Sequence, residues 1–238
     1  MQFIDSHIHL QDYKTRNTQQ IIASLRNTGC VGALVVAAKA DDFAKISALA
    51  DENADWMIPA FGVHPQYAAV SGEEDMLQLE YYLQKHPKAH IGECGLDRLQ
   101  EADLERQIGL LKRQMKLATL YQRPLNIHIV RAEDVISSLK KELPERFVLH
   151  SFAGSKPFLE DMLNRGAYLS LNPKVLQRKA ASLIELIPNE RLLTESDAPY
   201  QAKAEDIPDF IEKLAAIRGN APEKLAAAIR DNFDRLAK

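Results

Sequence analysis

The sequence predicts a single (β/α)8 barrel of the TIM type with an extra helix at its C-terminal end. Short β-type apolar runs alternate with helical patterns along the whole chain, which is typical of a parallel sheet with helical crossovers. Eight such runs in 238 residues give about 30 residues per strand and helix, close to the roughly 250 residues of a typical barrel. Histidine and acidic residues end several of these runs, where the strand tips of a barrel converge.

The strands are expected near Phe3–Ile4, Ala33–Val36, Met57–Phe61, His90–Gly92, Pro124–Ile127, Phe147–Leu149, Tyr168–Leu171 and Leu192–Thr194. Helices are expected near residues 18–27, 41–53, 74–85, 103–121, 132–141, 156–165, 180–187, 206–217 and 222–236. In the clearest helix, Leu104, Ile108 and Leu111 follow steps of three or four, and Asp103 is a suitable N-cap. A doubly wound open sheet has a similar alternation, and the positions of the polar strand tips favour the barrel.

Composition predicts one domain over residues 1–238, because no linker, charge block or low-complexity stretch divides the chain. With 46% hydrophobic and 26% charged residues the chain can bury a substantial core, and its net charge of −3 argues against coating nucleic acid through bulk positive charge. Cys30 and Cys94 build no disulfide framework. Neither a signal segment nor an apolar run of about 20 residues is present, which predicts a cytoplasmic protein outside the membrane. A monomer is compatible with the sequence.

Six residues at presumed strand ends can bind metal. His7 and His9 are two apart, so both side chains point to one side of an extended strand and can bind one ion. Glu93 follows Ile91-Gly92, and its two oxygens can bridge two ions. The other candidates, each after a separate apolar run, are His128, His150 and Asp197.

This set supplies enough nitrogen and oxygen ligands for two divalent ions with open positions, as catalytic sites require. Mixed imidazole and carboxylate ligation is compatible with Zn, Mn, Mg or Fe. We expect Glu93 and Asp197 to be catalytic, because Asp197 can also take a proton from bound water. No Gly-x-Ser-x-Gly, Gly-x-Gly-x-x-Gly or P-loop motif occurs, and a small buried thiol explains Cys94 better than a nucleophile.

The chain resembles the TatD family of metal-dependent deoxyribonucleases, within the amidohydrolase-like barrel superfamily. The resemblance spans nearly the whole sequence, and its specificity comes from the order of several motifs. These are Asp5-Ser6-His7-Ile8-His9-Leu10, Gly62-Val63-His64-Pro65, Ile91-Gly92-Glu93-Cys94-Gly95-Leu96-Asp97, Arg106-Gln107 with Gln114, Pro124-Leu125-Asn126-Ile127-His128, Leu149-His150-Ser151-Phe152-Ala153-Gly154, Glu195-Ser196-Asp197-Ala198-Pro199-Tyr200 and Asp231-Asn232-Phe233.

The resemblance implies that His7, His9 and Asp197 serve one metal, that His128 and His150 serve a second, and that Glu93 serves both. It implies cleavage of DNA phosphodiester bonds by metal-activated water, in the manner of a 3′ exonuclease. It also implies that His64 reaches the substrate, although a turn residue before Pro65 is an alternative. The further candidates for substrate binding are Arg131, Glu195 and Tyr200, and Glu195 can also support or ligate an ion near Asp197.

Three departures from the family pattern affect the walls of the site. The loop after Tyr200 is short, the arginine after His128 is displaced by one residue to Arg131, and Ser170-Leu171-Asn172-Pro173 replaces the usual Ser-Phe-Ser-Gly. Because the same ion pair can polarise a carbonyl group, a hydrolase of a small ester, lactone, amide or aminoacyl-tRNA bond is the alternative function. A barrel that only binds ligands is a third hypothesis, which the complete ligand set disfavours.

Overall fold

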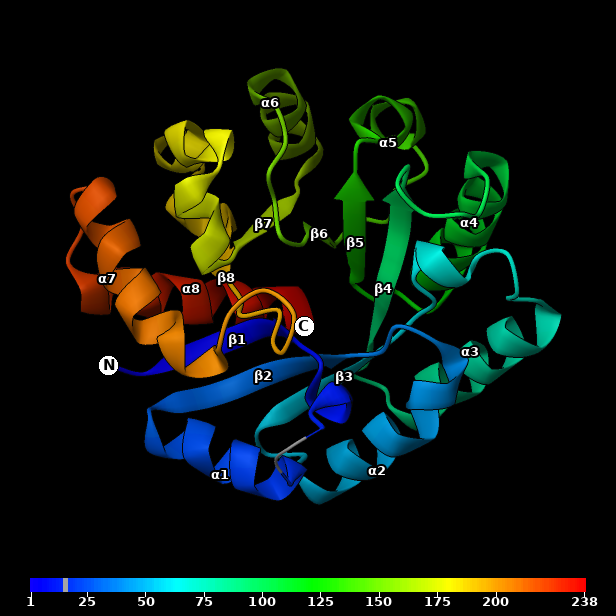
Figure 1. Ribbon diagram of the computed structural model, residues 1–238, viewed down its shortest axis with the longest axis horizontal. Coiled ribbons are helices and arrows are strands. Elements are labelled where there is room, and N and C mark those ends of the chain that lie inside the picture. Colours follow the sequence, from blue (N-terminus) through cyan, green and yellow to red (C-terminus); the bar gives the residue numbers. More distant parts are fainter. Residues whose placement is uncertain (15–16) are drawn as a thin grey trace.

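A computed structural model describes residues 1–14 and 17–238. Eight parallel strands form one sheet in sequence order, and helices surround it (Figure 1). The structure confirms the predicted (β/α)8 barrel. Phe3, Phe61 and Phe147 are fully buried in its core.

The strands are β1 (Phe3–Ile8), β2 (Cys30–Val36), β3 (Met57–Phe61), β4 (His90–Asp97), β5 (Leu125–Val130), β6 (Phe147–Leu149), β7 (Tyr168–Leu171) and β8 (Leu192–Thr194). The helices are α1 (Thr18–Asn27), α2 (Phe43–Glu52), α3 (Glu73–Lys85), α4 (Leu104–Leu120), α5 (Glu133–Leu139), α6 (Lys156–Arg165), α7 (Ile207–Ile217) and α8 (Pro222–Ala237). Short 3-10 helices lie between them, and the expected helix near 180–187 is one of these, η5 (Lys179–Leu186).

Three strands, β1, β4 and β5, continue beyond their expected carboxyl ends. β1 runs on through Asp5, Ser6 and His7, and β4 runs on through Glu93 to Asp97. All residues of these two strands are buried, because the polar side chains near their ends lie in the mouth of the barrel and not in solvent. The apolar runs therefore located the strands but not their carboxyl ends.

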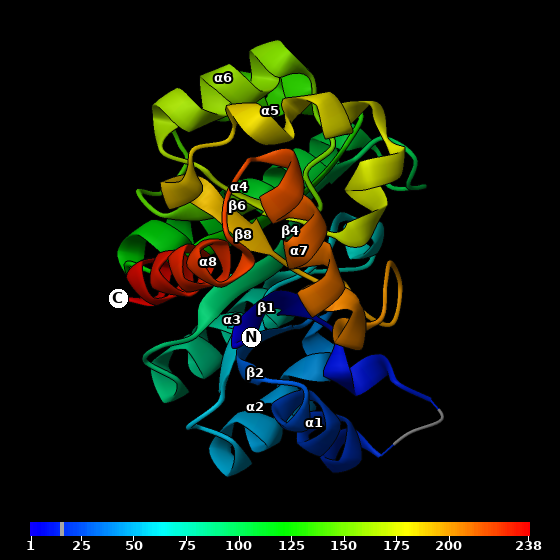
Figure 2. The same cartoon turned by 90° about the vertical axis from the view of Figure 1, so that its left-hand side faces the viewer.

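Two helices follow the last strand and complete the barrel. α8 packs against β1 and β8, so the C-terminal helix covers the place where the first and last strands meet (Figures 1 and 2). The predicted cap of α4 is confirmed, since the Asp103 side chain accepts a hydrogen bond from Arg106 N at 2.8 Å. In the part of the chain that is described, no helix has the length and apolar character needed to span a membrane.

Candidate metal centre

The structure brings all six expected metal-binding residues to the carboxyl ends of the strands. His7, Glu93 and His128 lie in β1, β4 and β5, and the other three follow β1, β6 and β8. The side chains of the three that follow, His9, His150 and Asp197, are each less than a tenth exposed. In a barrel the carboxyl ends of the strands form the face that carries active sites.

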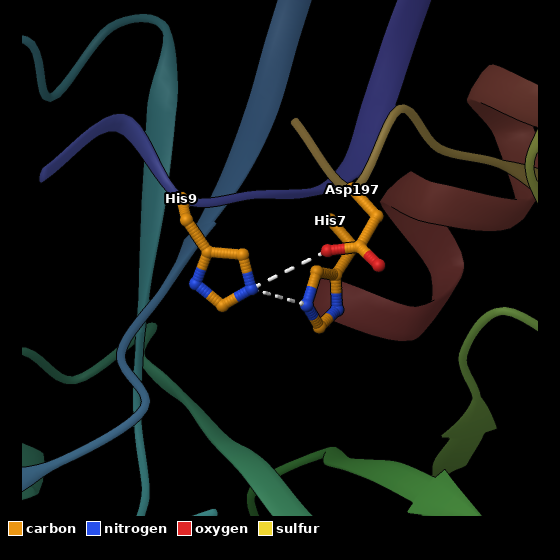
Figure 3. Close-up of side chains that lie close together, drawn as sticks. All are labelled: His7, His9 and Asp197. Carbon is orange, nitrogen blue, oxygen red and sulfur yellow. Dashed lines mark hydrogen bonds and ion pairs between the residues drawn. The ribbon is translucent and has the colours of Figure 1, made fainter. Parts of the chain in front are cut away.

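His7, His9 and Asp197 form one half of the centre. His9 Nε2 lies 3.1 Å from His7 Nε2 and 3.5 Å from Asp197 Oδ1 (Figure 3). The three residues come from opposite ends of the chain, and Figure 3 shows the His9 ring directed at the other two side chains. Asp197 has a φ of 50°, a left-handed conformation that is uncommon for a residue with a side chain. Uncommon backbone conformations of this kind cluster at active sites and ligand-binding positions.

His128 and His150 form the other half. His128 Nδ1 and His150 Nε2 lie 3.3 Å apart, and each is 2.8 Å from Glu93 Oε1. A glycine makes this arrangement possible. Gly95 has a φ of 148°, and a Cβ atom there would collide with the backbone carbonyl of His128 on the neighbouring strand. The close approach of β4 and β5 therefore requires glycine at this position.

Glu93 joins the two halves. Its Oε1 faces His128 and His150, whereas its Oε2 lies 3.6 Å from His7 Nε2 and 3.5 Å from His9 Nε2. Burial would raise the pKa of Glu93, but its electrostatic interactions with the surrounding histidines, first of all His150, and its contact with His128 hold it well below its usual value. Among the described residues, no lysine or arginine forms an ion pair with Glu93 or Asp197. Glu93 is therefore an ionised carboxylate that offers one oxygen to each histidine pair.

The donor atoms fit divalent metal ions. Ligands about 2.1 Å from an ion lie about 3.0–3.4 Å from one another in octahedral or tetrahedral geometry, and the nitrogen pairs in the two halves are 3.1 and 3.3 Å apart. The Glu93 and Asp197 contacts of the first half, at 3.5–3.6 Å, are slightly wider. The set of buried imidazoles and carboxylates also matches the chemistry of such sites.

Each histidine of the second half has a carboxylate close to its other ring nitrogen. His128 Nε2 lies 3.5 Å from Asp97 Oδ2, and His150 Nδ1 lies 3.2 Å from Glu195 Oε1. Metal-binding histidines almost always have such a partner on the second ring nitrogen, which fixes the ring and raises its basicity. Although burial raises the pKa of Asp97, its contacts with His128 and Gln100 lower it to about 2, so this carboxylate is ionised.

Sequence reasoning assigned no function to two buried carboxylates in the mouth of the barrel, those of Asp97 and Asp5. Asp97 was noticed only as part of a motif, although it is four residues after Glu93 in the same strand. Asp5 was also noticed only as part of a motif, although it is two residues before His7. In both cases the same-face spacing of an extended strand was the available signal.

The structure places Glu195 in the protein interior next to His150, and not where the site is open to solvent. Its side chain is fully buried, and its Oε1 accepts a hydrogen bond from Ser151 N at 2.7 Å as well as facing His150. Glu195 also belongs with His7 and His150 to a group whose potential ligand atoms lie within 4.8 Å of one another. The sequence placed Glu195 beside the ion of Asp197, whereas in the structure it faces His150, an expected ligand of the second half. Its contact with substrate stays a prediction.

His64 lies against the second half, 3.6 Å from Glu93 Oε1 through its Nε2. Its Nδ1 accepts a hydrogen bond from Gln66 N, which leaves the proton of the neutral ring on Nε2. Burial lowers the pKa of His64 to about 4, so the ring is neutral near pH 7. A protonated nitrogen donates a hydrogen bond and does not ligate a metal, which favours a contact with substrate for His64.

The two remaining candidates are at the rim. Tyr200 is 60% exposed, its hydroxyl donates to Asp12 Oδ2 at 2.8 Å, and its ring edge lies against His9. A cavity of about 1010 Å³ beside it is lined by residues that include Asp12, Tyr200 and Lys203. Arg131 is exposed, and its backbone carbonyl accepts a hydrogen bond from Arg98. Substrate contact by either side chain stays a prediction.

A second cavity, of about 1080 Å³, lies far from this centre. Its lining includes Trp56, Arg123 and Arg146, which precede β3, β5 and β6 and so lie at the amino ends of the strands. None of the expected metal-binding residues lines it.

Comparison with known proteins identifies the family. The family model described as TatD related DNase matches residues 4–238. This chain belongs to that family. A relative within it, the uncharacterized metal-dependent hydrolase YjjV of Escherichia coli K12, is 31% identical over 97% of this chain and 95% of its own length.

Further TatD-related proteins agree in sequence and in fold. The protein named 3'-5' ssDNA/RNA exonuclease TatD of Erwinia tasmaniensis is 29% identical over 93% of each chain. The crystal structure of YjjV superposes with a TM-score of 0.90 at 28% identity, covering 98% of this chain and 97% of that one. A TatD family hydrolase of Entamoeba histolytica has the same fold, with a TM-score of 0.88 at 20% identity. The resemblance found in the sequence is thus confirmed.

Proposed function

We propose that this protein is a metal-dependent nuclease that hydrolyses phosphodiester bonds of single-stranded nucleic acid, removing nucleotides from the 3′ end. The observation that carries the proposal is Glu93, which presents a different oxygen to each of two histidine pairs in the mouth of the barrel. Membership of the TatD related DNase family supports a nuclease, and relatives named 3'-5' ssDNA/RNA exonuclease support the polarity.

Two divalent ions are the proposed cofactors. His7, His9 and Asp197 would hold one, His128 and His150 the other, and Glu93 both. When bound, such ions neutralise phosphate charge and lower the pKa of a water molecule. The donor set is compatible with Zn, Mn, Mg or Fe.

The protein's own groups supply orientation and proton transfer in this proposal. Asp197 accepts a proton from the water that attacks phosphorus and returns it to the 3′ oxygen whose bond to phosphorus breaks. His64 Nε2–H donates a hydrogen bond to a phosphate oxygen of the substrate. Asp97 and Glu195 fix the rings of His128 and His150 through their outer nitrogens. Tyr200 offers an exposed ring at the rim, where a base can stack.

The test is cleavage of end-labelled single-stranded DNA and RNA by chelator-treated protein resupplied with Mn²⁺, Mg²⁺ or Zn²⁺. We expect stepwise shortening from the 3′ end that depends on the ion. Glu93→Ala should abolish turnover with the fold retained, whereas Glu74→Ala, which removes an exposed carboxylate on α3, should cleave at the normal rate.

Normal turnover in Glu93→Ala would remove Glu93 from the mechanism. If loaded protein leaves DNA and RNA intact but cleaves carboxyl esters or aminoacyl-tRNA, the alternative hydrolase replaces the nuclease. Both outcomes can be read from the same preparation.

A further inference from the structure

The first and last strands meet at the metal centre through few backbone hydrogen bonds. Within the described residues the strand pairs run from β1 to β8 in order, and no ladder pairs β8 with β1. Instead, Asp197 N donates to His7 O and His9 N donates to Ala198 O, each at 2.9 Å. The segments joined here are the ones that carry His7, His9 and Asp197. Their separation therefore depends on this seam.

One buried side chain reinforces the seam. The carboxylate of Asp5, which is fully buried, accepts hydrogen bonds from Ser196 Oγ at 2.6 Å, Ser196 N at 3.0 Å and His7 N at 3.2 Å. Ser196 Oγ in turn accepts a hydrogen bond from Ala198 N at 3.1 Å. A single carboxylate thus holds the backbone of one expected ligand and the residue next to another.

Joining two strands of a sheet through a buried carboxylate is energetically unfavourable. Burying a carboxyl group costs free energy, and none of the described lysines or arginines forms an ion pair with Asp5. A hydrogen bond between two neutral side chains joins strands nearby: Ser6 Oγ in β1 and Ser170 Oγ in β7 lie 2.7 Å apart. What distinguishes Asp5 from that pair is its contact with the ligand-bearing backbone.

We propose that Asp5 is a positioning residue of the metal centre. Its carboxylate holds the His7–His9 segment at a fixed distance from Asp197 and so sets the geometry of the first half of the centre. This inference depends on the proposed function, because it requires that the first half binds an ion. The second half, built on His128 and His150, has no contact with Asp5 and should be independent of it.

The experiment is calorimetric titration of chelator-stripped protein with Zn²⁺ or Mn²⁺. The variant His7→Ala identifies the binding step that belongs to the first half. We expect Asp5→Ala to weaken that step about 10- to 100-fold, as loss of an outer partner of a metal ligand does, and to leave the other step unchanged. Asp5→Asn keeps an acceptor for both backbone N–H groups and should retain most of the affinity.

Ser170→Ala is the matched control, because it removes a buried hydrogen bond between strands that does not touch a ligand. It should bind metal as the wild type does, even if its unfolding temperature falls in the apo form. Should Asp5→Ala fail to fold, Ser196→Ala removes one bond to the same carboxylate, and it should weaken the same step by a smaller factor.

Three results separate the hypotheses. Wild-type affinity at both steps in Asp5→Ala, or in Ser196→Ala where that variant takes its place, overturns the positioning role while the proposed function stands. An equal loss in Ser170→Ala also overturns it, since any buried hydrogen bond between the strands would then have the same effect. A wild-type protein that binds no metal contradicts the proposed function itself.

Discussion

Buried negative charge is concentrated in the mouth of this barrel. Four carboxylates there are at most 6% exposed, namely those of Glu93, Asp97, Glu195 and Asp197. No described lysine or arginine pairs with them, and histidines are their main charged neighbours. Buried charge of one sign is costly unless it is compensated. Divalent cations between the histidine pairs would provide that compensation.

Asp97 gives a prediction at the scale of one side chain. Replacing Asp97 with alanine leaves His128 Nε2 without its carboxylate, so the ring should be less basic and less fixed. We expect a loss of about 10- to 100-fold in metal affinity or kcat/KM. The control is Asp134→Ala, which removes an exposed carboxylate paired with Arg98 and should leave both quantities unchanged. Equal values for Asp97→Ala and wild type would exclude an orienting role.

Individual site residues were predictable from sequence when they ended an apolar run. His128 and His150 do so, and the structure brings them within 3.3 Å of one another. Glu195 was placed near Asp197 by its spacing, but only the structure shows that it lies behind His150. Contacts between residues 45 positions apart depend on tertiary packing, which local spacing does not contain.

At the scale of elements, the alternation of apolar runs and helical patterns predicted all eight strands, because each run is an independent local signal. The carboxyl ends of β1 and β4 were underestimated, since polar residues in a strand look like loop to a hydrophobic pattern. The stretch near 180–187 has the apolar content of a helix but forms η5, a 3-10 helix.

The approach of β4 to β5 gives a prediction for these elements. Gly95→Ala places a methyl group against the His128 carbonyl at a φ that alanine rarely adopts. We expect a loss of about 1–3 kcal/mol or more in the free energy of unfolding and reduced metal binding by the second half. Gly109→Ala is the control, because Gly109 lies within α4 with open space around it. Gly109→Ala should raise the free energy of unfolding by up to about 1 kcal/mol. Urea denaturation measures the free energy of unfolding of both variants.

At the scale of the whole molecule, the proposed metal centre would connect distant parts of the chain. The proposed ligands come from the ends of β1, β4, β5, β6 and β8. These strand ends lie together only in the native state, so an ion held by them would stabilise that state and not the unfolded chain.

A ligand present at a hundred times its Kd stabilises the native state by about 2.7 kcal/mol. For a chain of this size each 1 kcal/mol raises Tm by about 2–4 °C. We therefore expect Mn²⁺ to raise the Tm of chelator-stripped protein by about 5–10 °C in thermal melts followed by circular dichroism. Glu93→Ala should show a clearly smaller shift, because both halves lose a shared ligand, whereas Glu74→Ala should show the full shift. Identical melting curves with chelator and with Mn²⁺, Mg²⁺, Zn²⁺ or Fe²⁺ would mean that none of these ions prefers the folded barrel, and the proposed metal centre would have to be abandoned.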